Sequence, residues 1–447
     1  MQDRTYLPFT EKMKKDYTIL VPNMLPLHFK LIMSVMKTYG YNMELLETDG
    51  PQIAETGLKY THNDTCYPAI LVIGQFMDAL LSGKYDTHKV ALIMFQTGGG
   101  CRASNYISLI RKALAKAGMD YIPVISMSFS GLEKHPGFKL KPGMLMKVFF
   151  AGLCGDVMMS LVNQVRPYEL NRGDAEALAE KLTAEIGKEM GESKRLPYKK
   201  VRGYYEKITR EFEKIPMRSE RDAVRVGIVG EIFVKYSPLA NNDLERFLVS
   251  EGAEPVVPGL IDFMLYMIYN GISEYRIYKR GAKAYPIYCL AYKILCKEKR
   301  KIGRIIAESG VFRPWEPFEN VVEIAESIIS TAVKMGEGWL LTAEMLELAE
   351  SGCKGVVCTQ PFGCLPNHIC GKGMMKPIKQ LIPEVNIVAI DYDAGASRVN
   401  QENRLKLMLS NATKKTSAKS PCEAQADVIS ESELATPSEI ITEKVLN

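Results

Sequence analysis

Histidine, net charge and long apolar runs are all scarce in this chain of 447 residues. Its 57 Lys and Arg residues nearly balance 52 Asp and Glu residues, which leaves a formal net charge of +5. This excess is too small to indicate a nucleic-acid-binding protein, and we recognise no basic run interleaved with aromatic residues. No stretch approaches the about 18 uninterrupted apolar residues that a transmembrane helix needs. We therefore expect neither a nucleic acid nor a membrane among the partners.

A signal peptide is also missing from the given sequence. Its first residues, Met1–Tyr6, lack the apolar segment of such a peptide, which favours a cytoplasmic location. The composition, 47% apolar and 24% charged, is typical of soluble globular proteins. At about 150 residues per domain, the length predicts two or three domains.

Cysteine, in contrast, is abundant: the chain has ten cysteines but only five histidines. Disulfides are disfavoured in a cytoplasmic protein of this size, so a metal or redox role becomes the better explanation. Because imidazole is scarce, a metal site would consist mostly of thiolates. Such a donor set favours an iron–sulfur cluster or a cysteine-rich zinc site.

Short apolar segments alternate with helical patterns along much of the chain. This alternation predicts parallel sheets joined by helical crossovers. We expect strands near residues 17–22, 43–47, 90–95, 121–126, 224–230, 254–257, 355–358 and 385–391. The predicted fold class is therefore α/β, with two Rossmann-like parallel-sheet domains and helical insertions.

The same reading gives the domain boundaries. We expect a first α/β domain over residues 1–140 and a mostly helical insertion over 141–222, in which Asp174 caps a helix. A second α/β domain, with its own helical insertion, covers 223–411. Residues 412–447 are rich in Thr, Ser, Lys, Glu and Ala, which predicts a disordered tail.

Three cysteines occupy the same kind of position, between a strand or loop and the start of a helix. Cys66 is followed by Tyr-Pro, Cys101 follows the strand 90–95 and three glycines, and Cys364 follows the strand near 355–358. Free N–H groups and the positive dipole end of a helix lower a thiol pKa and stabilise an anionic cluster. Open α/β folds also place their sites at the carboxyl edge of the sheet. These thiols are therefore candidate ligands.

Other cysteines have simpler explanations. Cys289 and Cys296 lie one heptad apart on an apolar helix, which indicates core packing, and Cys422 lies in the predicted tail. Packing is also an alternative for each of the three candidate ligands. A zinc site is a weaker alternative, because the series formed by Cys353, Cys358, Cys364 and Cys370 contains no C-x2-C unit.

Nucleotide-binding signals are poor. Gly98–Gly100 is not followed by Lys-Ser/Thr, and Gly227–Gly230 lacks the full dinucleotide fingerprint, so we expect that this chain does not hydrolyse ATP. His368 follows Cys364 by four residues, on the same helix face. It is a candidate proton donor near a cluster, or else a surface histidine. Arg102 and Lys372 are candidates to neutralise an anionic ligand, or else solvated residues at helix starts.

Three segments, Asn63–Ala69, Gln360–His368 and Asp391–Ser397, resemble those of the 2-hydroxyacyl-CoA dehydratase family. The resemblance covers most of residues 14–410 and is strongest to the branch related to the family's ATP-dependent activators. It implies a [4Fe–4S] cluster held by three cysteines, whose positions Cys66, Cys101 and Cys364 fill here. It also implies an open fourth iron site for an acyl-CoA substrate. A separate activator of the actin-like ATPase type would inject a low-potential electron for dehydration through a ketyl radical.

The resemblance leaves several alternatives open. Members of the family are heterodimers, so a second dehydratase-like subunit or a homodimer is implied. Cys154 and Cys358 are additional thiols, and with them a cluster would be fully ligated. Such a cluster would transfer electrons without binding substrate, and a relative of the family reduces small molecules on a double-cubane cluster. The remaining hypothesis is that the cysteines serve only in packing or bind zinc.

Overall fold

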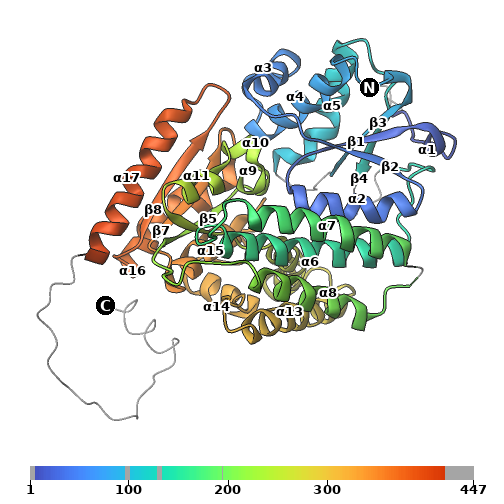
Figure 1. Cartoon of the computed structure of the whole chain (residues 1–447). Helices are drawn as coiled ribbons and strands as arrows, with labels where there is room; N and C mark the ends of the chain where they lie inside the picture. Colours follow the sequence, from blue (N-terminus) through green and yellow to red (C-terminus); the bar gives the residue numbers. More distant parts are fainter. Residues whose placement is uncertain (1–5, 96–100, 128–132, 194, 418–447) are drawn as a thin grey trace, which may run out of the picture.

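Two four-stranded parallel sheets form the framework of the protein (Figure 1). The structure is a computed structural model that describes residues 6–95, 101–127, 133–193 and 195–417. The first sheet has the order β2-β1-β3-β4, with β1 Thr18–Pro22, β2 Asn42–Leu46, β3 Val90–Phe95 and β4 Val124–Met127. The second has the order β6-β5-β7-β8, with β5 Val224–Gly230, β6 Ala253–Val256, β7 Gly355–Pro361 and β8 Asn386–Tyr392. The predicted fold class is confirmed.

The central strands are mostly apolar segments because helices cover both faces of each sheet. All seven residues of β7 are buried, and β3 is buried over its first four residues. In both sheets the strand order reverses beside the first strand, between β1 and β3 and between β5 and β7. Loops that leave such a switch point diverge at the carboxyl ends of the strands and leave a crevice for ligands.

Helices of the first domain pack closely on one another as well as on the sheet. A Cβ on Gly57 would lie 2.1 Å from the carbonyl oxygen of Ile70, and one on Gly74 would lie 2.0 Å from that of Ile53. Only glycine therefore allows α3 and α4 to approach this closely. The helices of this domain are α1 Met13–Asp16, α2 Pro26–Thr38, α3 Pro51–Tyr60, α4 Tyr67–Leu81, η1 Thr87–Lys89, η2 Arg102–Asn105 and α5 Tyr106–Lys116.

The middle segment is helical, as expected, and consists of α6 Pro142–Val165, α7 Asp174–Glu192 and α8 Tyr198–Glu213. Among the described residues, α6 is long and apolar enough to cross a membrane, but most of it is buried inside the protein. A core helix has these properties too, so this finding is weak support for a membrane span.

The expected cap of α7 is wrong. Asp174 is the first residue of the helix, and its side chain caps no N–H group there. The carboxylate of Glu169 takes that role, because it accepts hydrogen bonds from the N–H groups of Gly173 (2.6 Å) and Ala175 (2.8 Å). A longer side chain from the preceding turn therefore supplies the capping oxygens that the sequence pattern assigned to Asp174.

The second domain contains the predicted insertion between β6 and β7. It consists of α12 Leu260–Tyr278, α13 Tyr285–Glu308 and α14 Phe318–Ile328. The last helix, α17, continues to Ser417, past the expected boundary at 411, and residues 418–447 lie outside the described part. The other helices of the domain are α9 Ile232–Tyr236, α10 Pro238–Asn241, α11 Leu244–Ser250, α15 Gly338–Glu350, η3 Asn367–Gly371, η4 Lys372–Met374 and α16 Met375–Leu381.

The buried carboxylate of Asp156 in α6 joins three helices. It lies 2.8 Å from Nε2 of His28 in α2, and it accepts hydrogen bonds from the N–H groups of Leu260 (2.7 Å) and Ile261 (2.9 Å) at the start of α12. These N–H groups have no partner within their own helix. One side chain therefore links the first domain, the middle helices and the insertion.

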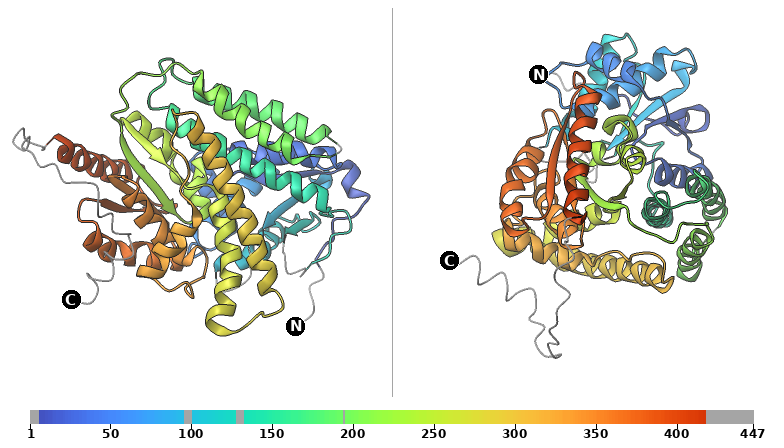
Figure 2. Two further views of the ribbon diagram at one scale, coloured as in Figure 1. Left: turned by 90° about the horizontal axis from the view of Figure 1, so that it is seen from below. Right: turned by 60° about the vertical axis from the view of Figure 1, so that its left-hand side comes forward.

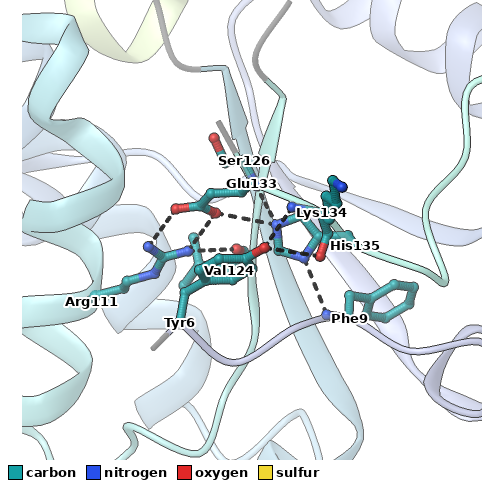
Figure 3. A network of polar contacts seen from close by, with 8 residues as sticks. All are labelled: Tyr6, Phe9, Arg111, Val124, Ser126, Glu133, Lys134 and His135. Atoms are coloured by element: carbon teal, nitrogen blue, oxygen red, sulfur yellow. Dashed lines mark hydrogen bonds and ion pairs between the residues drawn. The ribbon is translucent and has the colours of Figure 1, made fainter. Parts of the chain in front are cut away.

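A second polar network fixes the chain beyond the end of β4 (Figure 3). Arg111 of α5 makes two hydrogen bonds to the carboxylate of Glu133, at 2.7 and 2.8 Å. His135 accepts a hydrogen bond at Nδ1 from the N–H group of Phe9 (3.1 Å). Its Nε2 lies 3.3 Å from the carboxylate of Glu133 and 3.3 Å from the backbone nitrogen of Ser126. The network therefore anchors both ends of the first domain beside the carboxyl edge of its sheet.

Candidate functional site

The three candidate ligands lie at the carboxyl edges of the two sheets. Cys66 is the residue before α4 and Cys101 the residue before η2, so both occupy helix starts as predicted. Cys364 follows β7 by three residues and precedes the irregular helical turn that includes η3. Cys66 and Cys364 are buried, and Cys101 is partly exposed.

The segments that carry these cysteines meet at Gly363. Its backbone has a φ of +75°, and a Cβ there would lie 3.2 Å from Cα of Cys66 and 3.0 Å from Nη1 of Arg102. The N–H group of Tyr67 also donates to the carbonyl oxygen of Phe362 (3.1 Å). Residues adjacent to all three thiols, from both domains, are therefore in contact at this glycine.

Burial is the main cause of the pKa shifts of the three thiols. It raises the pKa of Cys66 and of Cys364, and it raises the pKa of Cys101 to about 11. The hydroxyl of Tyr106 lies 3.3 Å from Sγ of Cys66, and this hydrogen bond opposes the rise in the pKa of Cys66. Without a metal, all three groups are therefore protonated thiols at neutral pH.

Two glutamates complete the site, and the sequence analysis missed both. Glu231 follows β5 and accepts a hydrogen bond from the N–H group of Val234 (2.9 Å). Glu337 lies at the start of α15 and accepts one from the N–H group of Ile232 (3.0 Å). Their charges are among the causes that raise the pKa of Cys101 and Cys364. Burial raises the pKa of both carboxyls, and the charge of Glu337 raises that of Glu231 further.

Sequence signals for these glutamates existed. Glu231 directly follows a predicted strand, at the edge where α/β sites form. Glu337 stands between two glycines with φ values of +57° and +43°, and a Cβ on Gly338 would lie 2.1 Å from the carbonyl oxygen of Val333. This glycine pair allows the tight turn that holds Glu337 in place.

Tyr266, from α12 of the helical insertion, and Cys370, in η3, extend the site. The hydroxyl of Tyr266 donates to the carbonyl oxygen of Gly336 (2.8 Å), beside Glu337. Burial raises the pKa of Tyr266, and the charges of Glu337, Cys370 and Cys101 add to the rise. Cys370, which the sequence left unassigned, is thus a fourth thiol in the neighbourhood.

The two additional thiols that the sequence analysis considered lie in other surroundings. Cys154 is buried in the helical core that also contains Tyr204 and Tyr205. Cys358 is buried in β7, and its Sγ lies 3.3 Å from Oδ1 of Asn367. The structure therefore does not bring Cys154 to the Gly363 junction, and it directs Cys358 toward the polar side chain of η3. Cys296 is buried in the same core as Cys154, as expected for a packing residue.

His368 is exposed, and its imidazole lies against the side chain of Gln360. The amide nitrogen of Gln360 lies 3.0 Å from its Nδ1 and donates to Asp391 (2.9 Å). Lys372 lies 3.9 Å from the same Asp391, and Arg102 donates to the carbonyl oxygen of Asp64 (2.6 Å). Of the three residues, only Arg102 contacts the junction at Gly363.

A single metal ion and a cluster place different demands on these donors. Among the described residues, which omit 96–100 just before Cys101, no group of three or more His, Cys, Asp or Glu side chains is arranged around one metal position. A four-iron cluster binds each thiolate at a different iron, so its ligands lie farther apart than those of one ion. Thiols from three separate loops at one junction agree with that requirement. Gly98–Gly100 and Cys422 lie outside the described residues.

Comparison with known proteins gives no assignment. No protein-family model matches the chain, and no curated protein sequence matches it either. The case for a function therefore depends on the residues themselves and on the resemblance of the three segments.

Proposed function

We propose that this chain is an iron–sulfur protein of the 2-hydroxyacyl-CoA dehydratase type. In this proposal Cys66, Cys101 and Cys364 hold a [4Fe–4S] cluster, which supplies one-electron chemistry at low potential when bound. An ATP-dependent activator of the actin-like type delivers the electron, and the substrate is an acyl-CoA. The protein would act in the cytoplasm, with a second subunit or a second copy of itself.

The observation that carries the proposal is the junction at Gly363. Loops from the carboxyl edges of two separate sheets meet there, and each brings a cysteine adjacent to the contact. Packing alone does not require three thiols at equivalent helix starts. The resemblance of the segments around Cys66 and Cys364 to the dehydratase family is independent support.

The surrounding residues have definite roles in this proposal. The three thiols must lose their protons when they bind iron, so loading releases protons and becomes easier as pH rises. Tyr106 donates to Sγ of Cys66 and stabilises its thiolate. Burial raises the pKa of Glu337, and it raises the pKa of Glu231 to about 8, so Glu231 holds a proton beside the thiols at neutral pH. A protonated carboxyl avoids placing a further negative charge beside an anionic cluster.

Iron and sulfide analysis of protein purified without oxygen tests the proposal. We expect about four irons per chain and a broad absorption shoulder from thiolate-bound iron. Cys66→Ala, Cys101→Ala and Cys364→Ala should each lower the iron content, whereas Cys296→Ala, a buried cysteine in the helical core, should leave it unchanged. Iron content that is the same in all four variants would contradict the ligand assignment.

Electron transfer without substrate binding is the second candidate, and the position of Cys370 favours it. The charge of Glu337 acts on Cys101, Cys364 and Cys370. Cys370 would therefore add a fourth thiolate to the three candidate ligands, and the cluster would have no open iron. In that case Cys370→Ala should lower the iron content as much as Cys364→Ala, and an added acyl-CoA should leave the EPR spectrum of the reduced cluster unchanged. A double-cubane reductase would instead contain about eight irons, with further losses in Cys154→Ala and Cys358→Ala.

A further inference from the structure

A basic and apolar helical hairpin projects from the second domain. It comprises the end of α12, the connecting turn and the start of α13, and we call residues Tyr275–Lys297 the basic hairpin. In the left view of Figure 2 this hairpin, drawn in yellow, extends beyond the neighbouring helices. Its turn is therefore free to approach a flat surface.

The charge of the basic hairpin has one sign. It contains no Asp or Glu, and six exposed basic side chains: Arg276, Lys279, Arg280, Lys283, Lys293 and Lys297. The nearest acid before it, Glu274, is already paired with Lys334 and Arg280. Within the described part of the chain, Lys283, Lys293 and Lys297 take part in no ion pair.

An exposed apolar stripe lies beside these charges. Ile287, Leu290 and Ile294 are 68%, 61% and 57% exposed, and their spacing of three and four residues places them on one face of α13. Ile277 and Tyr278 add exposed apolar surface at the end of α12. Single exposed apolar residues are ordinary, but a contiguous group marks a binding surface.

The net charge of the whole chain does not reveal the basic hairpin. The net charge of +5 is small because acidic residues elsewhere balance the basic hairpin. Tyr275 and Tyr278 alternate with Arg276, Lys279 and Arg280, so the expectation of no basic run interleaved with aromatic residues does not hold at this turn. The expectation of no membrane partner rested on these averages and on the lack of a spanning segment, neither of which tests a surface contact.

We propose that the basic hairpin binds the surface of an anionic lipid bilayer. Ile277, Ile287 and Leu290 would enter the boundary between headgroups and acyl chains, and the Lys and Arg residues would contact lipid phosphates. A peripheral contact of this kind combines a positive polar face with apolar residues that do not span the membrane. Tyrosine suits the same depth, because its ring is apolar and its hydroxyl is polar.

The observations favour lipid over a protein partner for this surface. The basic hairpin protrudes from the protein and carries charge of one sign. Such a surface is complementary in charge to a broad anionic plane. A second copy of the chain would place two positive hairpins against each other if the stripes packed together, and like charges would oppose that contact. The proposal is independent of the iron–sulfur function and extends beyond it.

Vesicle flotation of the full chain tests the proposal. Vesicles of phosphatidylcholine with an equal part of phosphatidylglycerol should bind at least about tenfold more protein than vesicles of phosphatidylcholine alone. This difference should disappear at about 1 M salt, where the Debye length is about 3 Å. Equal binding to both vesicles, or binding to neither, would overturn the proposal.

Two variants test whether vesicle binding depends on the basic hairpin. Lys279→Ala/Arg280→Ala/Lys283→Ala should remove the preference for anionic vesicles. Ile287→Ser/Leu290→Ser leaves the charge of the protein unchanged, and it should weaken binding to anionic vesicles. The matched controls are Lys181→Ala/Lys188→Ala/Arg210→Ala and Leu170→Ser/Leu407→Ser, which change exposed residues elsewhere and should bind normally. Thermal unfolding checks that every variant is folded.

Two further outcomes would also overturn the proposal. One is anionic binding that survives both hairpin variants, since another surface would then bind the lipid. The other is self-association in sedimentation velocity that Ile287→Ser/Leu290→Ser abolishes while vesicles do not bind, since the stripe would then be a protein interface.

Discussion

Gly363 and Cys66 belong to different domains, yet their backbones are in contact. A Cβ on Gly363 would lie 3.2 Å from Cα of Cys66, and the φ of +75° at Gly363 is one that side chains with a Cβ rarely adopt. Backbone atoms cannot move aside as a flexible side chain can. This contact therefore fixes how closely the loops of Cys66 and Cys364 approach each other.

We expect Gly363→Ala to separate these two loops. The added Cβ strains the backbone and presses on Cys66, which should cost about 1–3 kcal/mol of stability and reduce the iron bound per chain. Gly83→Ala is the matched control, because Gly83 has a φ of +74° but nothing within 4 Å of its Cβ position. Denaturant unfolding and iron analysis of both variants separate backbone strain from the contact. Equal losses in the two would contradict the role of the junction.

Tyr106→Phe should raise the pKa of Cys66. The hydroxyl of Tyr106 stabilises the Cys66 thiolate, so its removal favours the protonated thiol. A hydrogen bond contributes about 0.5–1.5 kcal/mol and one pKa unit corresponds to about 1.4 kcal/mol, which predicts a shift of about half to one unit. The midpoint of Cys66 alkylation against pH, followed by mass spectrometry in cluster-free protein, measures it. Tyr204→Phe removes a hydroxyl that donates a hydrogen bond to Glu189, and it should not change the alkylation midpoint of Cys66.

Glu231 and Glu337 should make the cluster-free protein less stable as pH rises toward neutrality. Their pKa values are raised in the folded state, so above the usual glutamate range the unfolded chain has lost protons that the folded chain still holds. Stability then falls with rising pH, by up to about 1.4 kcal/mol per pH unit for each such group.

Glu231→Gln/Glu337→Gln tests whether these carboxyls make stability fall with rising pH. Glutamine keeps an oxygen for the N–H groups of Val234 and Ile232 but cannot ionise, so the variant should gain stability over wild type as pH increases. Denaturant unfolding between about pH 5 and pH 8 measures the difference. Glu308→Gln, at an exposed position on α13, should follow the wild-type profile. Parallel profiles for the double variant and wild type would show that the carboxyls are ionised in the folded protein.

The sequence predicted what depends on local pattern. The strands at 90–95 and 224–230 have the predicted bounds, because buried central strands are mostly apolar segments. The sequence also predicts the helix starts at Cys66 and Cys101, because Pro68 and the glycines before Cys101 are local signals.

Features that depend on distant contacts could not be predicted in this way. Glu231 and Glu337 are more than a hundred residues apart, and only the packing of β5 against α15 brings them to the same thiols. The cap of α7 was misassigned because Glu169, in the preceding turn, reaches the helix start through a conformation that the sequence does not specify. The exposed stripe of the basic hairpin has the same periodicity as a buried face, so periodicity alone does not reveal its exposure.

Asp156→Ala should destabilise the arrangement of the two domains more than the loss of an ordinary ion pair. It leaves Nε2 of His28 and the N–H groups of Leu260 and Ile261 without their acceptor in a buried site. Each unpaired buried donor costs about 1–3 kcal/mol, so we expect a loss of at least about 3 kcal/mol in denaturant unfolding. Asp222→Ala removes an exposed carboxylate paired with Arg218 and should change stability by less than about 1 kcal/mol. Similar losses in the two variants would mean that Asp156 is not a structural link, and the position of α12 relative to α2 would then depend on apolar packing alone.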